Sequence, residues 1–116
     1  MRDFHNYKVW NKGHQFALNI YKKTKSFPKE ELFGITSQIR RAATSIPFNI
    51  AEGCGRRSDA EFAHFLNIAA GSASEVEEEL LLSYDLGFLD ETAYEQLNSD
   101  VNDIKAMLNK LIETLH

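Results

Sequence analysis

Four polar side chains recur at helical spacing within residues 38–53, QIRRAATSIPFNIAEG. They lie at steps of four, four and three residues and therefore share one face of a helix; they are Arg41, Ser45, Asn49 and Glu52. A neighbouring face is an apolar stripe of Ile35, Ile39, Ala42, Ile46 and Ile50. Because polar groups beside a core need partners, we expect this polar face to contact other helices, a second subunit or a ligand. Antiparallel pairing with the next helix predicts an ion pair between Glu75 and Arg41 or Arg40.

Positive charge is concentrated in the first half of the chain. Residues 1–57 have a net charge of +7 and residues 58–116 a net charge of −11. Such asymmetry can mark a nucleic-acid-binding surface. The alternative is that basic helices pack beside acidic ones, within a bundle or between subunits. The candidate phosphate-binding residues are Lys22, Lys23, Lys25, Arg40, Arg56 and Arg57.

Catalytic and metal-binding patterns are weak. Glu61 and His64 form one Glu-x-x-His pair, whereas a di-iron bundle needs two such pairs and two further glutamates. The spacing of Arg57 and His64 resembles the Arg-x4–6-His motif of HEPN-type ribonucleases, which leaves a ribonuclease as a third interpretation. We predict no catalytic residues, no metal and no cofactor, and no small-molecule substrate is evident.

The expected fold is all-α, an antiparallel up-down-up-down four-helix bundle forming a single domain over residues 1–116. Apolar periodicity predicts helices at about 9–26, from 29 or 32 to 53, 58–87 and 90–116, with Pro47 bending the second. Ser58 with Glu61 predicts a capping box, Asp90 an N-cap, and Gly87 a helix end. Apolar residues beyond one stripe of the third helix (Phe65, Ile68 and Leu82) predict a homo-oligomer.

The chain also contains the runs RRAATSIPFNIAEG and RRSDAEFAHFLNIAAGSASEVEEEL, with VW near the start, FP at 27–28 and LGFLD at 86–90. These motifs resemble the bacterial four-helix-bundle proteins encoded in 23S ribosomal RNA intervening sequences. The resemblance implies a cyclic pentamer. It also implies kinship with accessory proteins of diversity-generating retroelements, which bind nucleic acid as pentamers. Those relatives are strongly basic, whereas this chain has a net charge of −4.

Two function classes follow. The first is a non-catalytic, ring-shaped homo-oligomer that binds RNA or DNA through basic rim residues. The second is a protein–protein interaction scaffold without a nucleic-acid role. One cysteine, no secretory apolar region and no stretch of ~20 apolar residues predict a cytoplasmic protein that does not insert into membranes.

Overall fold

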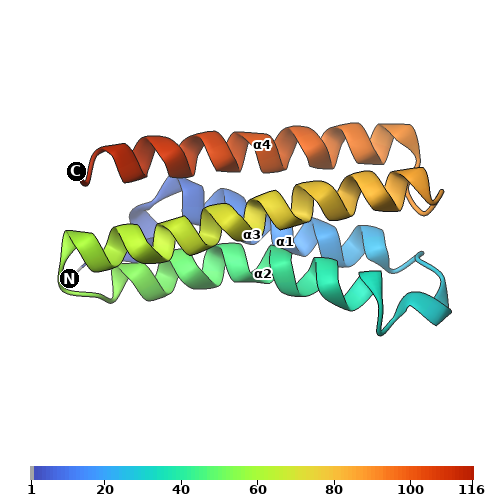
Figure 1. Cartoon of the computed structure of the whole chain (residues 1–116), viewed down its shortest axis with the longest axis horizontal. Coiled ribbons are helices and arrows are strands. Elements are labelled where there is room, and N and C mark those ends of the chain that lie inside the picture. The colour runs from blue at the N-terminus through green and yellow to red at the C-terminus, as the bar shows by residue number, and fades with distance from the viewer. Residues whose placement is uncertain (1) are drawn as a thin grey trace.

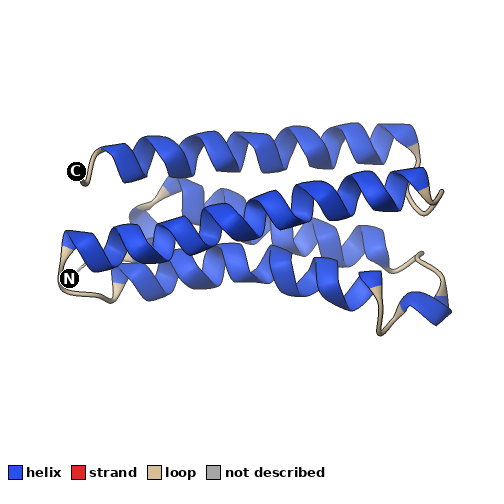
Figure 2. Cartoon of the chain, viewed as in Figure 1, coloured by secondary structure: helices blue, strands red, loops and turns tan. Residues whose placement is uncertain are grey.

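Four long helices account for most of the chain in a computed structural model, which describes residues 2–116. The helices are α1 (Lys8–Thr24), α2 (Ile35–Cys54), α3 (Asp59–Asp85) and α4 (Glu91–Glu113). Two short 3-10 turns, η1 (Phe4–Asn6) and η2 (Lys29–Glu31), precede α1 and α2. Figure 2 shows helices and loops but no strand within residues 2–116. The predicted all-α class is confirmed.

The helix ends follow from local sequence. The Ser58 hydroxyl oxygen accepts a hydrogen bond from the Glu61 backbone N–H at 3.1 Å, and an Asp90 carboxylate oxygen accepts one from Ala93 N–H at 2.7 Å. Both side chains satisfy backbone donors that the first turn of a helix leaves unpaired. Gly87 follows α3 with a φ of +82°, a conformation that costs energy for any residue with a Cβ. The predicted caps and the predicted stop are confirmed.

The second helix begins later than its sequence suggests. Its predicted start lay at residue 29 or 32, but Lys29–Glu31 form the separate turn η2 and α2 begins at Ile35. Pro47 is buried within α2, and the helix continues on both sides of it. The helix also ends one residue beyond the predicted Gly53, because Cys54 completes its last turn. Burial raises the pKa of the Cys54 thiol.

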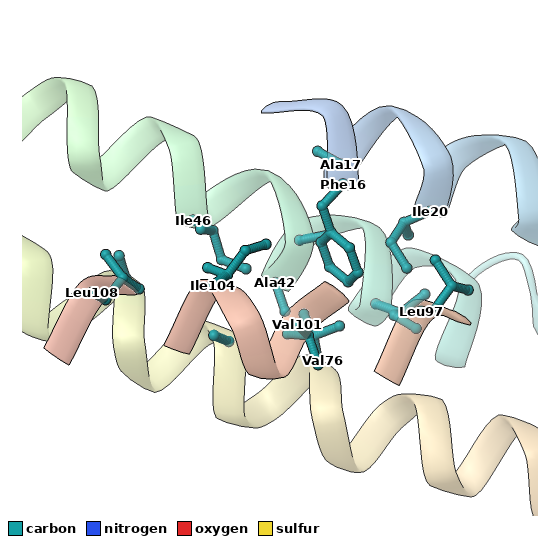
Figure 3. Close-up of a cluster of buried hydrophobic side chains, with 14 of the residues drawn as sticks. Phe16, Ala17, Ile20, Ala42, Ile46, Val76, Leu97, Val101, Ile104 and Leu108 are labelled. Atoms are coloured by element: carbon teal, nitrogen blue, oxygen red, sulfur yellow. The ribbon is translucent and has the colours of Figure 1, made fainter. Parts of the chain in front are cut away.

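The helices pack around one apolar core. Helix α1 packs against α2 and α4, and α3 packs against α2 and α4. Figure 3 shows side chains from all four helices meeting in this core, among them Phe16, Ile46, Val76 and Ile104. In Figure 1 the α1–α2 and α3–α4 connections lie at one end of the molecule, and the α2–α3 turn lies at the other end with the C-terminus. The molecule is 43 Å long, which separates these two ends widely.

Close approach of α2 and α3 depends on a small residue next to their connecting turn. A Cβ atom added at Gly53 would lie 2.9 Å from Cδ1 of Phe62 and 3.0 Å from Cβ of Phe65. Real side chains do not tolerate such distances without movement of their neighbours. Gly53 therefore allows α3 to pack tightly against the end of α2, which positions the basic residues of the turn.

Candidate nucleic-acid interface

Part of the predicted polar face joins α2 to α3. The Ser45 and Ser72 hydroxyls are hydrogen-bonded at 2.8 Å. The Asn49 amide donates to the Ser45 hydroxyl and to the Ser45 carbonyl, both at 2.8 Å. All three side chains are half-buried, so the network satisfies polar groups that the helix interface removes from water. Ser45 and Asn49 therefore find their partners within the bundle, which was one of the three possibilities for the polar face.

The other members of that face are not brought into this network. The Arg41 side chain is exposed, and Glu52 instead lies 3.7 Å from Arg56 in a pair four residues apart. The predicted ion pair of Glu75 with Arg41 or Arg40 was wrong: no such pair forms within residues 2–116. Residues 40 and 41 point about 100° apart around the helix, so they cannot both face α3. A long exposed side chain such as Arg41 gains little from a surface ion pair.

Arg40 is directed toward α1. Its Nε donates to the Thr24 hydroxyl at 2.8 Å, and its Nη2 donates to the Tyr21 carbonyl at 3.4 Å. The guanidinium also lies over the Tyr21 ring, 4.7 Å from its centre. These contacts fix Arg40 at the end of α1 that contains Lys22, Lys23 and Lys25. Sequence reasoning missed them because the partners are sixteen and nineteen residues apart.

Two adjoining hollows surround Arg40, each of about 410 Å³. They share Leu32, Thr36 and Arg40, and we refer to them together as the Arg40 pocket. Lys25 and Lys29 line the first hollow and Arg41 the second. The structure therefore brings two of the predicted candidates, Arg40 and Lys25, into one basic depression.

The α2–α3 turn holds a second basic group, with partial charge compensation. Arg56 lies 3.7 Å from a carboxylate oxygen of Glu52 and 4.0 Å from one of Glu61, and its guanidinium is 4.8 Å from the centre of the Phe65 ring. Its Nε is buried without a hydrogen-bond partner in residues 2–116. Arg57 is exposed. The six candidate basic residues thus form two groups at opposite ends of the molecule rather than one stripe (Figure 1).

One buried acid on α3, Glu79, has a raised pKa. Glu79 is only 7% exposed, and its Oε1 atom has no hydrogen-bond partner. Burial, followed by the charge of the nearby Glu75 carboxylate and a hydrogen bond with it, raises the pKa of Glu79 to about 8. Burial of a carboxyl group favours its neutral form because the charged form loses hydration. At neutral pH Glu79 is therefore mainly protonated, which lowers the negative charge of α3.

Glu61 and His64, the residues of the weak metal-binding pattern, have other contacts in the structure. Among residues 2–116, no group of three or more His, Cys, Asp or Glu side chains converges as a metal site would require. Glu61 takes part in the capping interaction with Ser58, and the exposed His64 ring lies edge-on to Phe65. Each helix within residues 2–116 is too short or too polar to cross a lipid bilayer.

These features define a small helical-bundle protein with a polar α2–α3 seam and basic groups at both ends. The sequence profile of the 23S rRNA-intervening sequence protein family matches residues 5–110, and the chain belongs to this family. The resemblance drawn from the sequence motifs is thereby confirmed.

A solved structure supports the same assignment. It is the crystal structure of a protein with unknown function from the S23 ribosomal protein family of Bacteroides thetaiotaomicron VPI-5482. The two chains are 34% identical, with a TM-score of 0.84 over 90% of this chain and 95% of that chain. No curated protein sequence matches the chain.

Proposed function

We propose that the protein is a non-catalytic, ring-shaped homo-oligomer, a pentamer, that binds RNA or DNA through its basic groups. The observation that supports assembly most strongly is the apolar surface left on α3. Ile68 and Leu82 are 39% and 44% exposed. They are separated by about four helical turns and so lie on nearly the same face. Leu86, 54% exposed, extends this surface beyond the end of α3.

Association would remove this surface from water. Burial of apolar surface contributes roughly 25 cal/mol for each Å². The exposed acids Glu75 and Glu78 lie on the same helix, and the net charge of +7 on residues 1–57 offers positive partners from an adjacent copy. Contacts between two different surfaces of each copy close into rings when the rotation allows it. These considerations support a ring with a basic group at each rim.

The solution mass tests this assembly. We expect the wild-type protein to have a mass several times that of its 13.2 kDa chain. Leu82→Glu should shift the mass toward the monomer, because it places a charge in a surface that association would dehydrate. Thr92→Glu is the matched control, since it adds the same charge at an exposed position of α4. A wild-type protein that remains monomeric at micromolar concentration would contradict the proposal.

Nucleic-acid binding is supported by the two basic groups, which contain Lys22, Lys23, Lys25 and Arg40 at one end and Arg56 and Arg57 at the other. Phosphate contacts release counterions, so affinity for single-stranded RNA should fall steeply as salt concentration rises. Arg57→Gln should weaken binding and reduce the slope of this dependence. Absence of RNA and DNA binding at ~50 mM salt would favour the scaffold function instead.

Three further points belong to this proposal. We place the helices in an up-down-up-down order, which the positions of the connections in Figure 1 support. We expect Pro47 to bend α2 because it removes a backbone donor.

A cytoplasmic location is consistent with the buried free thiol of Cys54. The protein should leave single-stranded RNA intact under conditions in which a known ribonuclease cleaves it; cleavage that depended on His64 would overturn the non-catalytic assignment.

A further inference from the structure

The Arg40 pocket has an excess of positive charge. Lys25, Lys29, Arg40 and Arg41 line it, and none of them forms an ion pair within residues 2–116. The nearest acids along the chain are those of η2, Glu30 and Glu31, and neither lines the pocket. Unpaired cations around a concave surface attract anions, because the surrounding protein focuses their field.

A buried hydroxyl in the pocket has no partner. Thr36 is 3% exposed, and its Oγ1 forms no hydrogen bond with residues 2–116 although the residue lines both hollows. An unsatisfied buried hydroxyl is unfavourable and rare in folded proteins. Thr36 lines both hollows, so a small movement of the side chains that cover it would let a ligand oxygen in the pocket provide the missing hydrogen bond. This second observation is independent of the charges.

Arg40 is positioned in advance for such a ligand. Its bonds to Thr24 and to the Tyr21 carbonyl, together with stacking on the Tyr21 ring, hold the guanidinium in place. They use two of its N–H groups, and an arginine has five. The remaining donors can bind two oxygen atoms of one phosphate group at once. Little side-chain entropy would then be lost on binding.

An aromatic ring stands at the edge of the same pocket. Phe33 lines the second hollow beside Arg40 and Arg41, yet it is 92% exposed. A phenylalanine this exposed contributes almost nothing to the core. Proteins that bind single strands combine a positively charged groove with aromatic rings on which unpaired bases stack. The combination of four cations, a buried hydroxyl without a partner and an exposed ring therefore matches a nucleotide better than a bare anion.

We propose that the Arg40 pocket binds one unpaired nucleotide, with its phosphate near Arg40 and Thr36 and its base on Phe33. The inference deepens the proposed nucleic-acid function by assigning its recognition site. The ligand chemistry is a phosphate ester bearing a planar base, and it can come from a single-stranded nucleic acid or from a free nucleoside monophosphate. A base held in a duplex cannot reach Phe33, so the site prefers single strands.

The test measures binding of a fluorescent single-stranded RNA, with the same strand in a duplex and a free nucleoside monophosphate as competitors. Phe33→Ala should weaken binding roughly 5- to 150-fold, the usual loss of one stacking partner. Phe33→Trp should retain the wild-type affinity for the RNA. Arg40→Gln should lower this affinity more than Phe33→Ala does. Phe48→Ala is the matched control, because Phe48 is another exposed phenylalanine, 68% exposed, that lies outside the pocket.

The outcomes separate this site from the broader function. RNA binding that is lost in Arg57→Gln but unchanged in Phe33→Ala and Arg40→Gln would overturn the pocket and leave nucleic-acid binding intact. Binding of the monophosphate without RNA binding would retain the pocket and overturn the broader function. Absence of both RNA binding and monophosphate binding would overturn the pocket. The pocket would also be overturned if Phe33→Ala changed the solution mass and left the affinity for RNA unchanged, because Phe33 would then be an assembly contact. Phe33 is too exposed for its replacement to unfold the protein, so the test does not depend on Arg40 variants.

Discussion

Replacement of the buried acid Glu79 by glutamine should make the stability of the protein less dependent on pH. Glu79→Gln keeps the shape of the side chain and removes the titration. The ordinary pKa of this group is 4.5, and the folded protein raises the pKa to about 8. The folded state therefore binds a proton more tightly than the unfolded chain does. It follows that the wild-type free energy of unfolding falls as pH rises from about 4.5 to about 8.

The size of the effect follows from the same shift. One unit of pKa difference corresponds to 1.36 kcal/mol, so the full shift would give an upper limit of about 5 kcal/mol. Part of the shift comes from Glu75, which is exposed and whose charge water screens. We therefore expect Glu79→Gln to be about 1–2 kcal/mol more stable than wild type at about pH 9, and nearly equal to it at about pH 4.

Urea unfolding followed by circular dichroism, repeated across this pH range, measures the difference. Glu78→Gln is the matched control, since Glu78 is the exposed neighbour and its replacement should leave the pH dependence unchanged. If the wild-type and Glu79→Gln stabilities changed in parallel from acid to alkaline pH, the pKa of Glu79 would be the same in the folded and unfolded states. The account of its burial given above would then be wrong.

Two further predictions concern the helix connections. Gly53→Ala should destabilise the protein by about 1–3 kcal/mol, because the added Cβ lies 2.9 Å from Phe62 and overpacks the α2–α3 contact; urea unfolding measures the loss, and an unchanged midpoint would show that the contact is not tight. Asp90→Ala should cost about 1 kcal/mol through loss of the α4 N-cap, whereas Asp90→Asn should restore most of it. Equal thermal stability of the two Asp90 variants would refute the capping role.

The features that sequence reasoning predicted are those that depend on neighbouring residues. Ser58, Asp90 and Gly87 act on backbone groups within a few residues of themselves, so their roles could be read locally. Apolar periodicity likewise gave four helices, since each must bury one stripe. Ile68 and Leu82 are exposed, as expected if α3 is more apolar than one bundle can cover. Phe65, the third residue of that expectation, is instead half-buried beside Gly53 and Arg56.

The features that escaped prediction depend on how distant segments meet. The direction of Arg40 is set by Thr24 and Tyr21 on another helix, and periodicity says nothing about that choice. The same reasoning placed Arg40 or Arg41 against Glu75, because it assumed that the polar face pointed wholly toward α3. The Arg40 pocket was missed because it requires the position of η2. The raised pKa of Glu79 was missed because the burial of this side chain depends on packing rather than on composition.

The hydrogen bond between Ser45 and Ser72 has a consequence for folding accuracy. Two apolar helix surfaces can slide along each other with little change in buried area, and a shift of one turn moves the backbone by about 5.4 Å. Such a shift would separate the two hydroxyls and leave them, together with the Asn49 amide, half-buried without hydrogen-bond partners. The polar contact therefore favours a single alignment of α2 on α3. A sequence with alanine at both serine positions would keep its helices but lose the penalty that excludes misaligned forms.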